Sequence, residues 1–389
     1  MTLPSLMTLP EAFQDLPDPR TGNAIRHSFL EVILIALCAT IAGADNAEEI
    51  ARWAKVQEKW LKKFLTLPHG SPSADTFLRI FAALAPEAFN ERFLLWAKGI
   101  FTTEAIVTPG GKEVIAIDGK TLKASANKGK ELGALHLVSA WASHNRLVLA
   151  QTAVDQKENE ISAIPLILEM LELKGCIVTI DAMGCQKQIA QQILAAEGHF
   201  FLQLKGNHDI LLDRVKDFFD TERARGFTTS HGDAVAHSFA QTLDKGHGRL
   251  EIRRCWMVEN AQYLDTADSE GHTFGFTSIV CLESERRQGD KVSVHTRYFL
   301  SDLPADAGVA LGCIRRHWGI ENRLHWVLDV CFDEDHCTIR EENARENFAI
   351  LRHIALNLLT REKSRKGGVV GRRKIAGWDV DYIPTVLAA

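Results

Sequence analysis

The sequence predicts a mixed α/β protein, in which an N-terminal helical domain precedes an α/β core and an antiparallel β domain is inserted into that core. Two apolar strands, ending at Ile117 and at Ile180, indicate the core. Strands that are apolar on both faces are typical of the middle of a covered sheet. Apolar side chains that alternate with period two between residues 235 and 300 indicate the insertion.

Length and composition place the chain among ordinary globular proteins. Its 389 residues are enough for two or three structural units. A hydrophobic fraction of 46% and a charged fraction of 24% exclude a mainly disordered chain. The net charge of −5 excludes a protein that coats nucleic acid with a uniformly basic surface, but it allows a local basic surface. The longest apolar run, residues 32–44, is shorter than the ~20 residues of a membrane span and predicts a core helix.

Cysteine usage and the N-terminus indicate a cytoplasmic protein. The eight cysteines are scattered singly, which is typical of reduced thiols, and no signal peptide is visible. One cluster could suggest zinc: His325, Cys331, His336 and Cys337. Its spacing fits no common zinc-ligand pattern, so ordinary core and surface residues are the preferred interpretation.

Residues 1–106 are expected to form the helical domain, with helices near 28–43, 46–65, 74–84 and 87–104. Residues 112–206 and 303–360 are expected to form the α/β core. Its first part predicts further strands at 135–142, 147–154 and 199–204 and helices at 161–173 and 186–196, and helices return in 304–360.

Residues 207–302 are expected to form the β-rich insertion domain. A helix near 210–219 precedes four alternating segments, at 235–243, 250–258, 274–282 and 292–300, with hairpin turns at 245–248 and 288–290. Residues 361–389 remain as a basic C-terminal tail. The charges here are segregated, since residues 329–346 carry a balance of −5 and residues 360–374 a balance of +6. The tail could bind phosphates or could be a solvated segment.

Asp118 and Asp181 each follow one of the two apolar strands. Strands that end at the same edge of a sheet can bring two carboxylates side by side, and adjacent carboxylates repel unless they are protonated or hold a cation. Magnesium prefers such oxygen sites, and two divalent ions can clamp the oxygens of a phosphoryl transfer. The alternative is that each Asp only caps a turn.

Glu321 is the third candidate acid. It lies on an apolar helical stripe with Ile314 and Leu328, which predicts a buried carboxylate in need of a cation or a hydrogen-bond donor. His317 and His325 lie four residues on either side of it. The alternative is a structural Glu–His or Glu–Arg pair. The nearby acids are interpreted as a solvated cluster: Asp329, Asp333, Glu334 and Asp335. Lys120, Lys123 and Lys205 are candidates for contact with a phosphate backbone.

Four segments, in this order, resemble bacterial insertion-sequence transposases of the H-repeat-associated group. They are VIAIDGKTLKAS (114–125), IVTIDAMGCQKQIA (177–190), LQLKGNH (202–208) and RRHWGIENRLHWVLDVCFDED (315–335). Residues 15–46 also resemble the helical domain associated with that group. The resemblance implies a ribonuclease H-like catalytic core whose Asp-Asp-Glu triad is Asp118, Asp181 and Glu321, holding two Mg²⁺ ions, with Mn²⁺ as a substitute.

The same resemblance implies a DNA transposase that cleaves the ends of an insertion sequence and transfers the 3′-hydroxyl into target DNA. Its partners would be terminal inverted repeats and target DNA, bound by a homodimer in the bacterial cytoplasm at the nucleoid, without a membrane. The alternatives are a domesticated, non-catalytic DNA-binding protein and a metal-dependent nuclease without strand transfer.

One departure from the family pattern concerns the phosphate contacts around Glu321. Many relatives have a Tyr seven residues before this Glu, an Arg four before and a Lys seven after, where this chain has Ile314, His317 and Leu328. The roles of that Tyr, Arg and Lys therefore do not transfer. The candidate substitutes are Arg315, Arg316, Asn322, Arg323 and His325.

Overall fold

The computed structural model describes residues 8–22, 25–101, 111–127, 129, 132–154, 159–228, 235–246 and 248–389. The chain divides into two compact units. The first contains residues 1–102, 119–159 and 321–389, and the second contains residues 103–118 and 160–320. This division differs from the expected one, because the C-terminal residues group with the N-terminal helices. The expected boundary after residue 106 lies outside the described residues.

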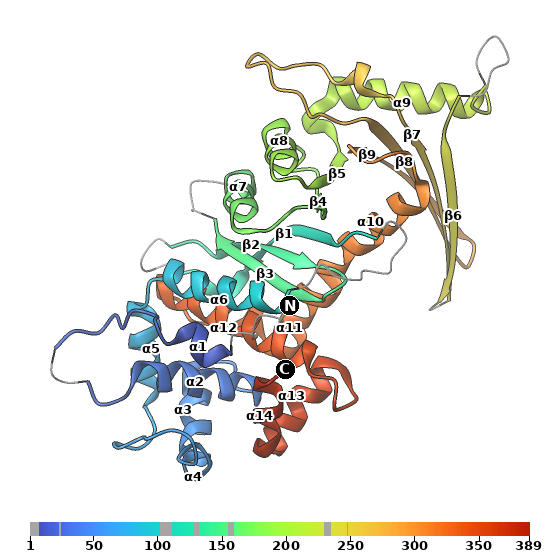
Figure 1. Cartoon of the computed structure of the whole chain (residues 1–389). Coiled ribbons are helices and arrows are strands. Elements are labelled where there is room, and N and C mark those ends of the chain that lie inside the picture. The colour runs from blue at the N-terminus through green and yellow to red at the C-terminus, as the bar shows by residue number, and fades with distance from the viewer. Residues whose placement is uncertain are drawn as a thin grey trace, which may run out of the picture. The chain divides into compact units, whose positions relative to one another are not determined.

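The first unit is mainly helical (Figure 1, blue and red). Its N-terminal helices are α1 (Leu9–Phe13), α2 (Phe29–Ile41), α3 (Ala47–Val56), α4 (Glu58–Leu61), α5 (Ala74–Ala83) and α6 (Pro86–Ile100). Its C-terminal helices are α11 (Trp326–Phe332), α12 (Glu342–Arg361), α13 (Gly368–Trp378) and α14 (Ile383–Leu387). A π-helical turn, Glu321–His325, precedes α11.

Helix α12 is the centre of the first unit, because it is buried on almost every side and packs against α2, α5 and α6. Its buried polar residues include Asn347 and Arg352, which are hydrogen-bonded inside the unit. The hairpin of β2 (Leu135–Ala142) and β3 (Leu147–Ala153) also packs against α6 and α12. Asn357 of α12 accepts from the backbone N–H of Val148 and donates to its carbonyl, both at 2.8 Å. The N-terminal helices therefore share one core with α12.

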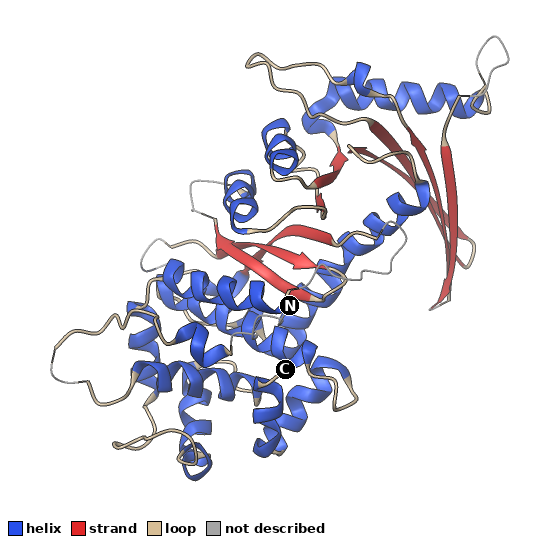
Figure 2. Cartoon of the chain, in the orientation of Figure 1, coloured by secondary structure: helices blue, strands red, loops and turns tan. Residues whose placement is uncertain are grey.

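The second unit contains the parallel part of the sheet (Figure 2, red arrows). Strand β1 (Val114–Leu122) passes from the second unit into the first after Asp118. It pairs in parallel with β4 (Ile177–Ile180), and β4 pairs in parallel with β5 (His199–Leu204). Helices α7 (Glu160–Met170) and α8 (Lys187–Ala195) connect these strands. The expected order strand–helix–strand–helix–strand, which begins with β3 and ends with β5, is confirmed.

The inserted β region continues the same sheet. Helix α9 (Asp209–Ala224) precedes the antiparallel strands β6 (Ser238–Gly246), β7 (Arg249–Val258), β8 (Ser278–Gln288) and β9 (Lys291–Ser301). Strand β9 pairs with β5, so the described strands are hydrogen-bonded in the order β3-β2-β1-β4-β5-β9-β8-β7-β6. The third expected strand was placed too early, because it begins at Ser278 rather than at Phe274. Helix α10 (Ala307–Ile320) packs on β4, β6 and β7.

Residues 361–389 are not an extended tail but fold as α13 and α14. Arg372 and Arg373 are buried and donate to backbone carbonyls of the first unit.

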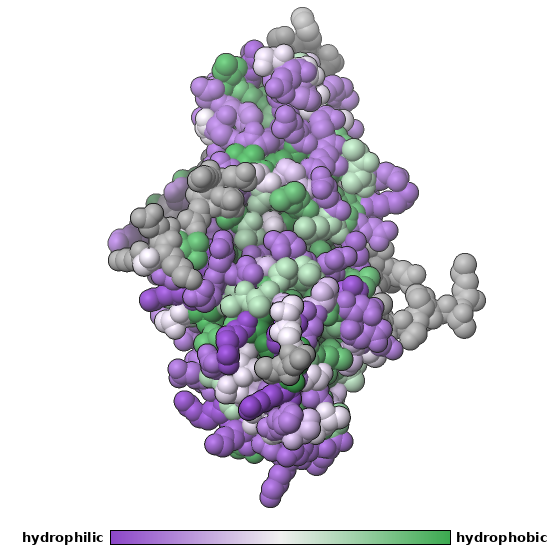
Figure 3. All heavy atoms as spheres, turned by 90° about the vertical axis from the view of Figure 1, so that its left-hand side faces the viewer, coloured by the Kyte–Doolittle hydropathy of each residue, from purple (hydrophilic) through white to green (hydrophobic). Residues whose placement is uncertain are grey.

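The space-filling view shows mostly hydrophilic side chains on the face in view, with hydrophobic ones in small patches (Figure 3). Among the described residues, no helix is long and apolar enough to cross a membrane.

Candidate functional site

Asp118 and Asp181 lie at equivalent positions of neighbouring parallel strands, Asp118 within β1 and Asp181 directly after β4. Ile117 of β1 is paired in register with Ile180 of β4, and the next residue on each strand is the aspartate. Neighbouring strands lie about 4.8 Å apart, and residues in register point to the same face of a sheet. The structure therefore brings these two carboxylates together at the carboxyl end of β4, as the apolar strands had predicted. The expected end of the first strand at Ile117 was wrong, because β1 continues to Leu122.

The backbone that follows β4 orients Asp181. Its Oδ1 accepts hydrogen bonds from the N–H groups of Met183 at 2.9 Å and Gly184 at 3.4 Å. Gly184 is required in this turn, because a Cβ atom there would lie 2.3 Å from Cγ2 of Ile180. The turn is therefore held tightly against the strand, and it fixes one carboxylate oxygen of Asp181.

Helix α10 covers the face of the sheet on which both aspartates lie. Thr179, two residues before Asp181 on β4, is hydrogen-bonded through Oγ1 to Nδ1 of His317 at 3.0 Å. Because residues two apart on a strand share a face, Asp181 and its neighbour Asp118 also face α10. Burial lowers the pKa of His317, although the charge of Asp181 opposes this effect. Burial therefore favours the uncharged form of His317.

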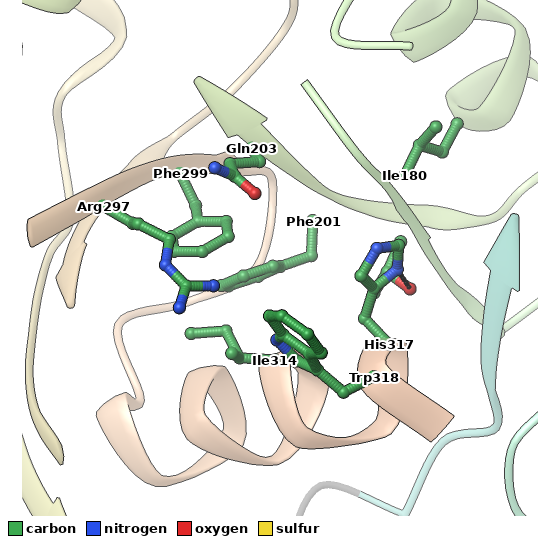
Figure 4. A pocket seen from close by; sticks show the side chains of 9 residues that line it. Ile180, Phe201, Gln203, Arg297, Phe299, Ile314, His317 and Trp318 are labelled. Atoms are coloured by element: carbon green, nitrogen blue, oxygen red, sulfur yellow. Dashed lines mark hydrogen bonds between the residues drawn. The ribbon is translucent and has the colours of Figure 1, made fainter. Parts of the chain in front are cut away.

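A small cavity of about 20 Å³ lies between α10 and the sheet (Figure 4). It is lined mainly by aromatic and aliphatic side chains, together with Gln203 and Arg297. The guanidinium of Arg297 lies 5.4 Å from the ring centroid of Trp318. A cavity of this size holds about one water molecule, so it is too small to receive a substrate.

Glu321 is exposed, so the expectation of a buried carboxylate was wrong. Helix α10 ends at Ile320, and the next five residues form the π turn, which contains an extra residue. The extra residue rotates the apolar stripe, so that Ile320, Leu324 and Leu328 are buried while Trp318 is 42% exposed. Such turns are frequent at functional sites.

Lys120 is buried in an ion-pair network of the first unit. Its Nζ donates to Oδ1 of Asp329 at 2.5 Å and to Oε2 of Glu334 at 2.7 Å. The side chain of Glu334 is only 1% exposed, so placing it in a solvated acidic cluster was wrong. Burial acts to lower the pKa of Lys120, but the charges of Glu334 and Asp329 outweigh it and raise the pKa. Burial acts to raise the pKa of Glu334, yet Lys120 and Arg352 hold that pKa below its usual range.

The other candidate DNA contacts are divided between the two units. Lys205 is exposed just after β5, the strand next to β4. Lys123 is exposed and pairs with Asp335 at 3.0 Å. Arg315 is exposed on α10, 3.9 Å from Asp244, and Arg316 beside it is half-buried. Asn322 and Arg323 are exposed on the π turn, but burial lowers the pKa of His325 to about 4, so His325 is no cation at neutral pH.

Sequence reasoning missed a basic surface on the inserted strands. The register of β7, β8 and β9 places Arg253, Arg286 and Arg297 on one face of the sheet, the face that also carries Cys255 and Leu282 under α10. Arg249 and Lys291 share this face, and its acidic residues Asp244 and Glu251 form ion pairs with Arg249 and Arg253. The available signal was that Arg249 and Arg253, like Lys291 and Arg297, are an even number of residues apart and therefore share a face of their strand.

Comparison with protein families identifies the chain. Residues 109–358 match the model described as Transposase DDE domain, and residues 10–97 match the model described as DDE_Tnp_1-associated. The chain belongs to the DDE transposase family. The resemblance carried by the four sequence motifs is therefore confirmed.

Curated relatives match this DDE transposase over nearly its whole length. The H repeat-associated putative transposase YhhI of Escherichia coli strain K12 is 35% identical over 390 residues, which cover 98% of each chain. The putative transposase YncI of Escherichia coli O157:H7 is 37% identical over 388 residues, or 99% of this chain and 95% of the relative. Among solved structures, the piggyBac transposase synaptic complex with hairpin DNA covers 98% of this chain and 75% of its own, with a TM-score of 0.43 and 9% identity.

Transposases of this family generally use divalent metal ions. No group of three or more His, Cys, Asp or Glu side chains is gathered as a metal cluster in the described part of the chain. The donor chemistry of Asp118 and Asp181 nevertheless fits a hard cation, because Mg²⁺ is held by one or two carboxylates and completes its shell with water and substrate phosphates. These two aspartates are the residues that fit a metal ion.

Proposed function

We propose that this DDE transposase catalyses metal-dependent cleavage of DNA at the ends of an insertion sequence and joins the freed 3′-hydroxyl to target DNA. The observation that carries the proposal is the pairing of Ile117 with Ile180, which puts Asp118 and Asp181 side by side at a strand edge. The family match supplies the reaction class. The sheet order β3-β2-β1-β4-β5, with β1, β4 and β5 parallel, supports a ribonuclease H-like core.

Glu321 is proposed as the third acid. Helix α10 carries His317 onto β4 beside Asp181, and Glu321 follows one turn later, directly after the end of this helix. The exposure of Glu321 favours this role over a structural ion pair, because an exposed carboxylate can reach a cation or substrate. The π turn is the local feature that releases Glu321 from the apolar stripe.

In this mechanism, Asp118, Asp181 and Glu321 would hold two Mg²⁺ ions, which would supply Lewis-acid activation of a water or 3′-hydroxyl and neutralise charge on the phosphate. The chain's own residues prepare this site. The N–H groups of Met183 and Gly184 fix the orientation of Asp181. His317, hydrogen-bonded to Thr179, holds α10 against β4. Two DNA ends must be joined in one event, so we further propose a homodimer on DNA at the nucleoid.

The basic surface on β7–β9 is proposed as a contact for the DNA backbone, because it lies on the same face of the sheet as Asp181. Replacing the exposed residues Arg286 and Lys291 by glutamine should weaken DNA binding. Each lost phosphate contact should reduce the log–log salt slope of binding by about one unit. Lys216→Gln on α9 is the matched control, since it removes an exposed lysine paired with Asp213. An unchanged salt slope in the double variant would remove this surface from the DNA-binding site.

The metal dependence of cleavage tests the proposed function. Mg²⁺ or Mn²⁺ should support cleavage of terminal inverted-repeat DNA, because carboxylate sites select hard cations. EDTA should abolish cleavage. The larger Ca²⁺ should give bound but uncut DNA. Resolving the products as nicked, excised or joined separates the alternatives. Joined products identify a transposase, cut products without joining identify a nuclease, and binding without cleavage in any metal identifies a non-catalytic DNA-binding protein. Full cleavage in EDTA would contradict the metal mechanism.

A further inference from the structure

Two chain segments that leave the proposed catalytic acids meet inside the first unit. Strand β1 continues past Asp118 to Leu122, so Lys120 is two residues beyond this aspartate and on the same face of the strand. The π turn begins at Glu321 and continues into α11, which carries Asp329. From Gly119 and from Glu321 onward, both segments belong to the same compact unit.

The ammonium of Lys120 joins these two segments. Besides Asp329 and Glu334, it reaches the carbonyl of His325, the last residue of the π turn, at 3.4 Å. An ammonium has three N–H donors, and three acceptors surround this one. The Lys120 side chain is 11% exposed. It therefore has no donor left for a DNA phosphate, and the sequence-based assignment of Lys120 to phosphate contact gives way to an internal role.

Glu334 is itself paired with Arg352, a buried arginine of the core helix α12. Nη1 of Arg352 on α12 lies 3.8 Å from Oε1 of Glu334, and the Arg352 side chain is 2% exposed. Nη2 of Arg352 donates to Sγ of Cys337 at 2.9 Å and to the carbonyl of Asp45 at 3.3 Å. One acceptor of Lys120, the carboxylate of Glu334, is thus anchored to the core helix of the unit. Buried ion pairs contribute little net stability, so the geometry they impose is their more informative effect.

We propose that Lys120 is a positioning residue, whose buried ammonium locks the β1 segment after Asp118 to the π turn that starts at Glu321 and so holds these two acids in one geometry. This inference rests on the proposed roles of Asp118 and Glu321. Lys120 acts only through these acids and touches neither metal nor DNA.

The decisive variant is the double replacement Lys120→Met with Glu334→Gln, because it removes both charges of the buried pair together. The amide oxygen of the glutamine can still accept from Arg352, and Asp329 is 34% exposed to solvent. Lys62→Met is the matched control, since it breaks an exposed lysine–carboxylate pair of 2.6 Å in the same unit. Urea unfolding establishes that each variant is folded. DNA affinity and its salt slope are measured in Ca²⁺, cleavage at saturating DNA in Mg²⁺, and Mn²⁺ affinity of the DNA complex by electron paramagnetic resonance.

The double variant should bind DNA with unchanged affinity and salt slope but should cleave about 100-fold more slowly at saturating DNA, as misplaced catalytic groups do. Its Mn²⁺ affinity should fall about 10-fold or more, as on loss of supporting residues around a metal site. Cleavage and Mn²⁺ affinity at the level of the unsubstituted protein would overturn the proposal, as would a salt slope lowered by about one unit with an unchanged maximal rate.

Failure of the proposed function has a different signature, namely no cleavage by the unsubstituted protein in any metal. Mn²⁺ affinity then still decides the role of Lys120. Equal Mn²⁺ affinity of the unsubstituted protein and the double variant overturns the positioning role of Lys120.

Discussion

Replacing Asp181 by asparagine should reduce strand cleavage by about 1,000-fold or more, because the loss of a charged metal ligand removes several kcal/mol of transition-state stabilisation. Asparagine keeps the shape of the side chain, and its oxygen can still accept the hydrogen bonds from Met183 and Gly184 that orient Asp181. The turn after β4 should therefore remain folded. Asp118→Asn and Glu321→Gln should give the same loss with DNA binding retained.

The control for this series is Asp213→Asn, which neutralises an exposed carboxylate on α9 in the same unit as Asp118 and Asp181. Cleavage is measured on terminal inverted-repeat DNA in Mg²⁺, with binding measured separately in Ca²⁺. Full activity of Glu321→Gln together with inactive Asp118→Asn and Asp181→Asn would show that the third acid lies elsewhere. Activity of all three neutral variants would remove the triad.

The central strands and their aspartates could be predicted because the signal is local. Residues 114–117 and 177–180 are almost continuously apolar, and a strand of this kind has no stable place except in a covered sheet. When two such strands are parallel neighbours, their ends meet, and the residue after each strand lies at the same edge. The π turn left a weaker trace in the sequence, because Gly319, two residues before it, disfavours a regular helix.

The burial of charged residues could not be predicted, because it depends on partners that lie far away in the sequence. Glu334 and Asp329 look like solvated acids in a local acidic run, yet their partner Lys120 is more than 200 residues earlier. The exposure of Glu321 was also missed, because an ideal 3.6-residue period places it on the buried stripe. A single extra residue in the helix changes this phase, and the amino-acid composition does not predict where such a residue is inserted.

The basic C-terminal segment shows the same limit and gives a second prediction. Arg373 lies on α13, where its Nε donates to the carbonyl of Thr40 at 3.0 Å and its Nη2 donates to Oδ1 of Asp45 at 2.6 Å. It also donates to the carbonyls of Cys331 and Ala44, and its guanidinium lies 4.3 Å from the ring centroid of Phe332. This arginine joins α2, α11 and α13 and is a structural residue rather than a phosphate ligand.

Arg373→Met should therefore lower the free energy of unfolding by about 3–5 kcal/mol, because it leaves Asp45 and several backbone carbonyls of the core without their donor. The neighbouring residue Lys374 is exposed on the same helix, so Lys374→Met should change stability by less than about 0.5 kcal/mol. Urea unfolding of the full chain measures both values. If Arg373→Met kept the stability of the unsubstituted protein but lost affinity for DNA, Arg373 would return to the DNA-binding surface that the local charge balance first suggested.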